Sequence, residues 1–428
     1  MVDHAEMRAW LESTKQRGMS LGLTNTARAL NALGMKKKRP FTVHVAGSNG
    51  KGTCCAALTA ALSLRGISNL LFSSPHLIQV EERIRVNGES IASSLFDEAL
   101  ERVHKIDEGG ELTFFEVTFL TAMILANRIG VEVLVLETGL GGRLDATRTV
   151  AADVCLITSL SLEHTDVLGA TLPEIAKEKA AIARPNSPLI VRKPENAEVM
   201  RVIETVALNA GNEALGEEKG SAHVEIVAIP EDATYHAEAI VLAEAVWKRL
   251  SMISDTTFPR MSGVNWPARM QRWSSPSGHA PTYLLDGAHN PSGMERSMSE
   301  ICRLPAVISG AWVLLFGTSP QVNLAAMLRP LLAACNEFPP QCIVLSEPQG
   351  GRYPAVPVDE LFNEFDSSIP THLYPQPAMA VEYLMKQFST DTCVVSIGSL
   401  YMQGNVLQSL NQFIQQNDDA KQSNKKGD

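Results

Sequence analysis

Several features that mark specialised classes of protein are missing from the chain. It has no uninterrupted apolar run long enough to cross a bilayer, and its first residues lack the basic and apolar stretches of a secretory signal. Its seven cysteines are scattered without paired spacing, unlike a disulfide framework. A reducing compartment fits all of these features, so we expect a cytoplasmic protein.

Positive charge is also scarce. Lysine and arginine number 37 against 47 aspartate and glutamate residues, which leaves a formal net charge of −10. A protein that binds nucleic acid or a membrane surface usually carries a basic field. We therefore expect neither kind of partner, and we expect a monomer. If the substrates are anions, the positive groups that hold them must be few and local, because the whole molecule repels anions.

What the chain does contain is an alternation of short apolar runs and helical segments. Its 428 residues are too many for one ordinary core, so two domains are expected. Continuous apolar strands separated by helices predict an α/β fold with mostly parallel sheets covered on both faces. The predicted strands are residues 41–45, 69–72, 131–136, 154–158, 189–191, 283–285, 313–316, 342–345 and 393–397.

Composition along the chain predicts where the domains meet. Proline, glycine and serine cluster within residues 261–279, which makes this segment the best candidate for a junction. The chain after residue 414 is polar and charged with nothing to bury, so we expect a disordered tail. The predicted divisions are therefore residues 1–270, residues 271–414 and the tail of residues 415–428.

Polar or glycine-rich clusters follow six of the predicted strands. In open parallel sheets, ligands bind at the carboxyl ends of the strands. One such cluster alone would mean little, but six together predict an active site along that edge. The clusters are residues 47–53, 73–76, 137–145, 163–166, 286–290 and 398–399.

The first cluster, Gly47-Ser48-Asn49-Gly50-Lys51-Gly52-Thr53, is typical of a phosphate-binding loop. Glycines let successive backbone N–H groups face an anion, and the following helix adds its positive end. Lys51 would reach the terminal phosphates of a nucleotide, and the Thr53 hydroxyl could hold magnesium. The loop departs from the common pattern, because Val45 replaces the first glycine and Gly52 separates Lys51 from Thr53. A plain turn is the alternative.

A metal site is the hypothesis for three further residues at strand ends. Glu137 follows an apolar strand, where a carboxylate is costly unless it is paired or binds a metal. Its alternatives are a helix N-cap or an ion pair with Arg143. Ser74 and His164 follow other strands, and such groups suit magnesium only if water and phosphate oxygens complete the site. His164 could equally be a structural hydrogen-bonding residue.

These motifs resemble those of the folylpolyglutamate synthase and dihydrofolate synthase family, within the Mur-ligase superfamily of ATP-dependent amide-forming enzymes. The variant phosphate loop is similar to that family's loop, and the resemblance covers roughly residues 39–405. It implies a P-loop-type ATPase domain with a mostly parallel sheet, followed by a smaller Rossmann-like α/β domain that carries the glutamate-ligase part. The other matching segments are residues 73–77, 82–88, 113–116, 137–147, 164–165, 178–180, 286–291 and 398–401.

The resemblance also implies roles for individual residues. The phosphate loop would bind ATP together with Arg269, Asp286, His289 and Asn290. Two magnesium ions would be surrounded by Thr53, Ser74, Glu137, His164 and Lys179, with Lys179 carried as a carbamate. The catalytic residues would be Lys51, Lys179 and His164, and the pterin-binding residues would be Thr113, Phe115 and Asp145. By pattern alone, Lys179 would lie on the solvated face of an ordinary amphipathic helix, and Phe115 could be plain core packing.

The implied reaction joins L-glutamate to a folate-type carboxylate. The γ-phosphoryl group of ATP activates the carboxylate as an acyl phosphate, and the amino group of L-glutamate then displaces phosphate. The three pterin-site residues favour dihydropteroate as acceptor, with reduced folates as further acceptors of a bifunctional enzyme. A Mur-type ligase acting on another carboxylate and amino acid is one alternative, and a non-catalytic nucleotide-binding protein is the other.

The chain also departs from the family pattern. Thr138, Glu163, Ala181 and Ala268 stand where the family commonly has Val, Asp, Gly and Gly, and residues 317–323 lack the charged residues often found there. These changes leave the proposed phosphate and metal positions intact. They affect the glutamate and adenine side, and with it the prediction of the exact substrate.

Overall fold

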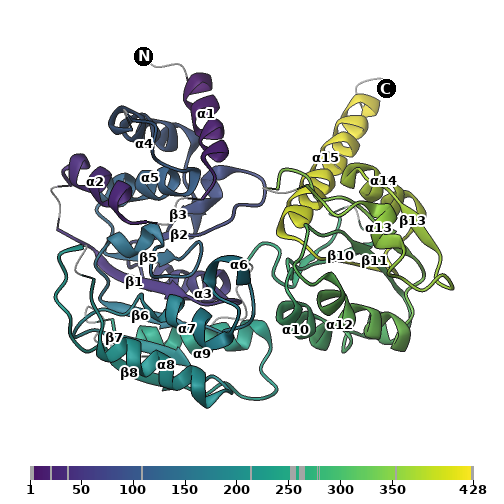
Figure 1. Ribbon diagram of the computed structural model, residues 1–428. Coiled ribbons are helices and arrows are strands. Elements are labelled where there is room, and N and C mark those ends of the chain that lie inside the picture. Colours follow the sequence, from purple (N-terminus) through teal and green to yellow (C-terminus); the bar gives the residue numbers. More distant parts are fainter. Residues whose placement is uncertain are drawn as a thin grey trace. The chain divides into compact units, whose positions relative to one another are not determined.

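The computed structural model divides the chain into two compact units, Met1–Val264 and Asn265–Asp428, each with its own sheet (Figure 1). It describes residues 4–19, 22–35, 38–107, 109–212, 215–250, 257–259, 266–276, 278, 280–351 and 354–425, the last ten of these by their backbone alone. The predicted junction at residues 261–279 therefore lies partly outside the described residues. Among the helices described, none is both long and apolar enough to span a membrane.

The first unit is built on an eight-stranded sheet of order β4-β3-β2-β5-β1-β6-β7-β8. Its strands are β1 (Phe41–Ala46), β2 (Asn69–Phe72), β3 (Ile84–Val86), β4 (Glu89–Ser90), β5 (Val133–Glu137), β6 (Val154–Ile157), β7 (Pro188–Arg192) and β8 (His223–Val227). Its helices are α1 (His4–Ser13), η1 (Thr14–Arg17), α2 (Thr24–Leu33), α3 (Lys51–Leu64), η2 (Val80–Arg83), α4 (Ser93–Ile106), α5 (Phe114–Ile129), η3 (Ala146–Thr149), α6 (Thr165–Leu168), α7 (Leu172–Ala180), α8 (Ala197–Leu208) and α9 (Tyr235–Trp247).

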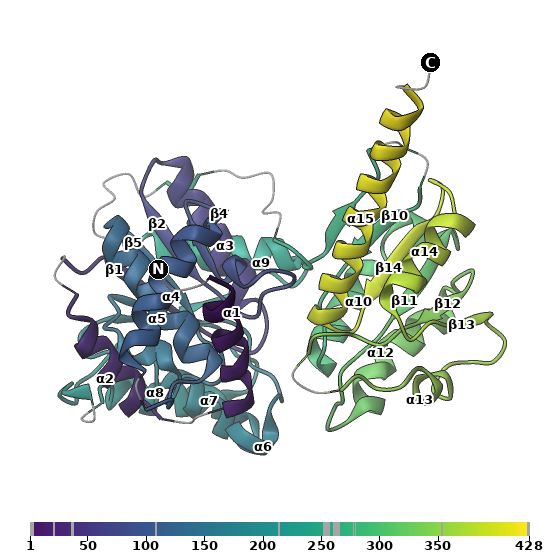
Figure 2. The same ribbon diagram turned by 90° about the horizontal axis from the view of Figure 1, so that it is seen from above.

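Helices cover both faces of this sheet (Figure 2). Strands β2, β5, β1 and β6 are parallel neighbours, and their near-continuous apolar sequences are buried on both sides. Helix α3 packs on β1, β2 and β5 from one face, together with α9. On the other face, α4 and α5 pack on β2 and β5, while α7 and α8 pack on β6 and β7.

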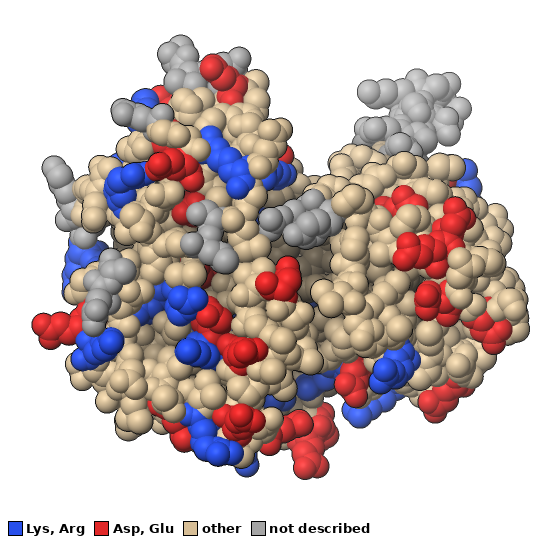
Figure 3. All heavy atoms as spheres, viewed as in Figure 1, with Lys and Arg blue, Asp and Glu red and all other residues tan. Residues whose placement is uncertain are grey.

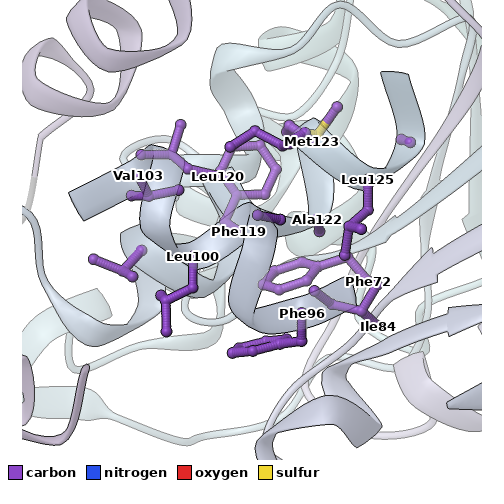
Figure 4. Packing of buried hydrophobic residues seen from close by; sticks show 14 of the residues in the cluster. Phe72, Ile84, Phe96, Leu100, Val103, Phe119, Leu120, Ala122, Met123 and Leu125 are labelled. Atoms are coloured by element: carbon purple, nitrogen blue, oxygen red, sulfur yellow. The ribbon is translucent and has the colours of Figure 1, made fainter. Parts of the chain in front are cut away.

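Aromatic packing fixes α4 and α5 to the sheet. The ring centroids of Phe72 in β2 and Phe119 in α5 are 5.6 Å apart in an edge-on arrangement. Phe96 and Leu100 of α4 extend the same cluster (Figure 4). This packing matters for the site, because α5 begins beside the carboxyl ends of the strands.

The second unit has a six-stranded sheet of order β13-β12-β11-β14-β10-β9, parallel except for β9. Helices α10 and α12 pack together, as do α14 and α15, on opposite faces (Figure 1). Its elements are β9 (Gln271–Trp273), β10 (Thr282–Leu285), α10 (Pro291–Ile301), α11 (Pro305–Ile308), β11 (Trp312–Phe316), α12 (Leu324–Glu337), β12 (Ile343–Leu345), α13 (Val358–Phe362), β13 (Thr371–Leu373), α14 (Pro377–Gln387), β14 (Cys393–Ile397) and α15 (Leu400–Lys425).

The α/β class predicted from the sequence is confirmed, and every predicted strand is present with its ends shifted by two residues at most. The sequence did not predict β3, β4, β8, β9 and β13. All five lie at or near a sheet edge, and their short, partly polar sequences lack a buried apolar run. The tail also differs, because α15 is helical to Lys425 where disorder is expected from residue 415. Extending an existing helix is easier than nucleating a new one, which favours this outcome.

Charged side chains of both signs lie interspersed over the first unit on the face shown in Figure 3. One ion-pair cluster is buried instead. The Arg148 guanidinium, 1% exposed, donates from both terminal nitrogens to the Glu217 carboxylate at 3.0 and 2.7 Å. Arg184 Nε lies 3.3 Å from the same carboxylate, and Arg184 donates to the backbone carbonyl of Arg148. A single carboxylate therefore compensates two buried cations that hold η3 in place.

Replacing Glu217 by Ala is expected to lower the free energy of unfolding of the first unit by about 3 kcal/mol, because both guanidinium groups would stay buried without a counter-charge. Chemical denaturation monitored by circular dichroism measures the loss. Glu218→Ala, which removes an exposed neighbouring carboxylate, is the control and should change stability by less than about 0.5 kcal/mol. Equal stabilities for the two variants would contradict this account.

Candidate active site

The candidate residues of the first unit lie at the carboxyl ends of four neighbouring central strands. Ser74 follows β2, Glu137 ends β5, the phosphate loop follows β1, and Glu163 and His164 follow β6. Since parallel strands end at the same edge of a sheet, the order β2-β5-β1-β6 gathers these side chains along one line. The structure thus brings together four of the six predicted clusters. The other two, residues 286–290 and 398–399, follow β10 and β14 in the separate sheet of the second unit.

The phosphate loop turns sharply from β1 into α3. Gly50 caps α3 with a left-handed φ of 84°, and Lys51 is the first helical residue. The Lys51 ammonium donates to the carbonyl oxygens of Gly47 at 2.9 Å and Ser48 at 3.3 Å, so it folds over its own loop. Thr53 is buried in the first turn of α3, at 1% exposure. The helix N-terminus adds a partial positive charge beside the ammonium group.

The loop is held against the segment that follows β6. Thr158 and Ser159 donate their hydroxyl hydrogens to the Asn49 carbonyl at 2.8 and 3.1 Å. The Ser48 N–H donates to the Ser159 carbonyl at 2.7 Å. Gly47 has a φ of 147° and leaves no room for a side chain, because a Cβ atom there would lie 1.9 Å from the Thr158 hydroxyl oxygen. A defined loop shape follows from these contacts.

The contacts of Glu137 test the alternative that its carboxylate forms an ion pair with Arg143. Its carboxylate accepts a hydrogen bond from the Ser74 backbone N–H at 3.3 Å, and the side chain is 5% exposed. Arg143 instead pairs with Glu178, at 2.9 Å. The structure therefore places Glu137 beside Ser74, as the metal hypothesis requires, and assigns Arg143 to a surface ion pair.

Lys179 is not on a solvated face, so the interpretation of its helix from pattern alone is wrong. It is 2% exposed, and its ammonium group lies 2.7 Å from a Glu163 carboxylate oxygen. It also donates to the Gly47 carbonyl at 2.9 Å. Burial lowers the pKa of Lys179, and Glu163 opposes that shift. Burial works against ionisation of Glu163 too, but the Lys179 and Lys51 charges hold its pKa low, at about 2.

These donors fit a magnesium site in part. The Glu137 carboxylate and the hydroxyls of Thr53 and Ser74 are hard oxygen ligands of the kind that magnesium prefers. The Lys179 ammonium cannot ligate a cation, and only a carbamate on this residue would supply oxygen donors. Among the described residues, no group of three or more histidine, cysteine, aspartate or glutamate side chains is arranged to hold a metal by itself. Phosphate and water oxygens would have to complete the coordination.

The three predicted pterin-site residues lie around the start of α5 and the loop after β5. Thr113 is the N-cap of α5, and its hydroxyl donates to Glu116 at 2.8 Å in a capping box. The Phe115 ring is half-buried and packs edge-on against Phe72, at a centroid distance of 5.5 Å. A Cβ atom on Gly139 would lie 2.6 Å from this ring, so the loop passes closely over Phe115.

Asp145 holds this loop from within. Its Oδ2 accepts the backbone N–H groups of Gly139 and Leu140 at 2.8 and 2.9 Å. Its Oδ1 accepts the N–H and the hydroxyl of Thr147 at 3.0 and 2.5 Å. Burial raises the pKa of Asp145, and these hydrogen bonds oppose the rise. All four acceptor positions of the carboxylate are thus occupied by its own loop.

In the second unit, the residues predicted to contact ATP cluster at the end of β10. Asp286 is 3% exposed and accepts hydrogen bonds from the Met270 and Ala288 N–H groups and the Ser297 hydroxyl. Asn290 caps α10, and its side chain accepts the Gly293 N–H at 2.7 Å. Asp286 therefore ties the end of β10 to residue 270, just after Arg269.

The other two residues predicted to contact ATP are His289 and Arg269. His289 lies close to its own turn, with Nδ1 2.7 Å from the Gly287 carbonyl oxygen. Arg269 lies between two residues of positive φ, Ala268 at 56° and Met270 at 48°. Non-glycine residues rarely adopt this conformation, which explains why glycine is favoured at a position such as 268.

Sequence reasoning missed several residues that shape the site. Thr158 and Ser159 follow β6 as polar residues, a signal that could have marked them as partners of the phosphate loop. Glu163 belongs to the predicted strand-end cluster of residues 163–166 and departs from the family pattern, but no role was predicted for it; an acidic residue there could have suggested a partner for a lysine. His44, inside the apolar strand β1, hydrogen-bonds to Thr147 and was not identified.

Comparison with known proteins places this geometry in a family. A curated relative from Escherichia coli (strain K12), named dihydrofolate synthase/folylpolyglutamate synthase, is 31% identical over 362 residues, which covers 81% of this chain and 83% of the relative. No protein-family model matches the chain.

Solved structures agree with this relationship. Escherichia coli FolC in complex with DHPP and ADP superposes with a TM-score of 0.79 at 25% sequence identity, covering 95% of this chain and 98% of that one. A bifunctional folylpolyglutamate synthase/dihydrofolate synthase with Mn, AMPPNP and L-glutamate bound gives a TM-score of 0.76 at 25% identity, covering 95% and 98%.

Replacing Gly47 by Ala is expected to weaken ATP binding by about tenfold or more, because the added Cβ atom meets the Thr158 hydroxyl and the backbone φ is unfavourable for alanine. Isothermal titration with Mg-ATP measures the affinity. Gly22→Ala is the control, since a Cβ atom there has open space. Unchanged affinity in the Gly47 variant would contradict the loop shape described above.

Proposed function

The chain belongs to the dihydrofolate synthase/folylpolyglutamate synthase family, whose members are ATP-dependent ligases, and from this membership we propose that it joins L-glutamate to dihydropteroate and to reduced folates. Related structures were solved with DHPP, ADP and L-glutamate, which supports these substrate classes. We also propose that it acts in the cytoplasm.

One observation carries the proposal. The carboxyl ends of four neighbouring parallel strands carry a serine, a carboxylate, the phosphate loop and the residues Glu163 and His164, and the acceptor loop of residues 139–145 follows β5. Lys179 of α7 forms a buried ion pair with Glu163 at the same edge. A protein that only bound a nucleotide would need the phosphate loop alone. The additional groups support transfer of a phosphoryl group to a second substrate held beside it.

The proposed chemistry follows from the poor leaving ability of a carboxylate oxygen. Transfer of the γ-phosphoryl group of ATP to the acceptor carboxylate gives an acyl phosphate and ADP. The amino group of L-glutamate then attacks the acyl carbon, and inorganic phosphate leaves as the amide forms. Lys51 would turn from the Gly47 carbonyl towards the phosphates and offset their charge, and the loop N–H groups would orient them.

We propose that Thr53, Ser74, Glu137, His164 and, as a carbamate, Lys179 hold the magnesium ions of the reaction. Bound magnesium would neutralise phosphate charge during transfer. Glu163 holds Lys179 within reach of the phosphate loop when its amine is unmodified. Ligands bound to the related structures, AMPPNP and Mn, support a nucleotide with a divalent cation.

Acceptor binding is proposed for the surface around α5 and the loop after β5. Phe115 would contact the pterin ring, Thr113 would position the start of α5, and Asp145 would act by holding the loop that covers Phe115. Arg269, Asp286, His289 and Asn290 are proposed to bind the nucleotide from the second unit. The first unit would be the ATP-binding domain, and the second the glutamate-ligase domain.

The proposal predicts that purified protein with Mg-ATP, L-glutamate and dihydropteroate releases ADP and forms dihydrofolate. A coupled ADP assay with chromatography of the folate product measures both. Chelation of magnesium should stop the reaction. Absence of turnover with both dihydropteroate and tetrahydrofolate would overturn the proposed function.

Two lysine variants test the role of Lys51 in this assay, and the second of them is the matched control. Lys51→Ala should reduce turnover about a hundredfold or more, because the charge facing the phosphates is lost, while the circular dichroism spectrum stays unchanged. Lys177→Ala removes an exposed lysine from α7 and should retain full turnover. Appreciable activity in the Lys51 variant would contradict its assigned role.

Asp145→Ala is expected to raise KM for dihydropteroate more than KM for tetrahydrofolate. The substitution removes four hydrogen bonds that shape the loop over Phe115, and dihydropteroate depends most on that loop because it has no glutamate tail for other contacts. Steady-state kinetics with each acceptor decides the point. Equal losses for both acceptors would remove the ground for a bifunctional enzyme with a dihydropteroate site here.

A further inference from the structure

A buried chain of hydrogen bonds connects the strand before the phosphate loop to the acceptor loop. His44 lies in β1 and is fully buried, with Nε2 2.7 Å from the Thr147 hydroxyl oxygen. That hydroxyl oxygen lies 2.5 Å from Oδ1 of Asp145. Asp145 in turn holds the backbone of Gly139 and Leu140. His44 therefore reaches the loop through two intervening side chains.

The positions of the protons in this series of hydrogen bonds follow from which groups can only donate and which can only accept. Asp145 accepts three backbone N–H groups, which favours its ionised form, so the single Thr147 hydroxyl hydrogen points to Asp145. The Thr147 oxygen must then accept, and His44 Nε2–H is the donor. Burial, together with the charges of Arg184 and Arg148, keeps the pKa of His44 well below its usual value, so the imidazole is neutral. Its Nδ1 is therefore a bare acceptor.

Burying a histidine at position 44 costs free energy of folding, so its presence there needs an explanation. Within the described part of the chain, His44 Nδ1 has no hydrogen-bond partner, although the ring is completely buried. An unpaired buried polar atom costs about 1–3 kcal/mol, and an apolar residue would avoid that cost in a strand whose neighbours are Val43 and Val45. Stability alone does not explain the residue.

The position of His44 within the sheet determines which parts of the site its hydrogen bond connects. His44 pairs with Leu136 of β5 and Cys155 of β6, and the next residue, Val45, pairs with Glu137. β1 then runs directly into the phosphate loop at Gly47. The side chain thus contacts η3 from the central strand that carries the phosphate loop, and no flexible connection intervenes.

We propose that His44 is a positioning residue of the ligase reaction, which fixes the acceptor loop relative to the phosphate loop by holding Thr147 and, through it, Asp145. This inference rests on the proposed function, because it assigns the loop of residues 139–145 to acceptor binding. Fixed spacing between these two loops would place the acceptor carboxylate near the γ-phosphoryl group. His44 would influence acceptor binding without touching the substrate.

Amide variants of His44 separate the hydrogen bond from simple filling of space. The amide nitrogen of glutamine can occupy the place of Nε2, whereas that of asparagine occupies the place of Nδ1. His44→Gln is therefore expected to keep KM for dihydropteroate within about threefold of the natural enzyme, while His44→Asn and His44→Leu raise it about tenfold, the size of one buried hydrogen bond. KM for ATP should stay unchanged in all three.

Thr147→Val provides an independent variant of nearly the same shape, in case the His44 variants fold poorly. It should raise KM for dihydropteroate to a similar extent. The double variant His44→Leu, Thr147→Val should be no worse than either single variant, because both break the same chain. Additive effects would overturn the proposal, as would a common fall in kcat and rise in both KM values, which indicates general damage to the fold.

Hydrogen–deuterium exchange gives a readout that does not depend on activity. Peptides covering residues 138–149 should exchange faster in His44→Leu and Thr147→Val, and at the natural rate in His44→Gln, because Gly139 and Leu140 donate to Asp145. Unchanged exchange in His44→Leu would overturn the proposal. If the natural enzyme fails to use dihydropteroate, the proposed function fails by itself, and the exchange rates still decide whether His44 holds the loop.

Discussion

Two ammonium groups, those of Lys51 and Lys179, donate to the same carbonyl oxygen of Gly47, and the shape of the site depends on this shared acceptor. It joins the phosphate loop to α7, and Glu163 joins both to the segment after β6. With Lys179 unmodified, the charges of these two lysines balance those of Glu163 and Glu137. Phosphate anions therefore need a further cation, which explains physically why an acidic protein of this fold would depend on magnesium.

The sheet makes this arrangement possible because its four central strands are parallel and adjacent. Their carboxyl ends present short loops that hydrogen-bond to one another, as Asn49 does with Thr158 and Ser159. Apolar strands buried on both faces resist displacement, since moving one would open a cavity in a close-packed core. The positions of Ser74 and Glu137 therefore depend on how the buried strands that carry them pack in the core. Polar contacts then adjust the loops by smaller amounts.

Much of the fold could be predicted from the sequence because buried parallel strands leave a clear apolar pattern. Strands such as β6 and β11 follow it from end to end, whereas β8 and β13 at the sheet edges carry polar residues and were missed. The site could be predicted where polar residues end a strand, as at Glu137. Lys179 could not be placed by pattern, because its helix resembles any amphipathic helix and only the tertiary fold buries it against Glu163. His44 could not be identified either, because only the tertiary fold places it beside Thr147.

Asp145 and Asp286 show how a carboxylate that follows a strand can act by holding its own loop. Each accepts two backbone N–H groups or more together with a side-chain hydroxyl, from Thr147 in one unit and Ser297 in the other. Such a carboxylate has few acceptor positions left for a substrate, yet its removal would release a loop that a substrate needs. Residues of this kind look like binding residues in a sequence, because their loss would impair binding. Their geometry shows that they also organise the loops, beside the ligand contacts proposed for them.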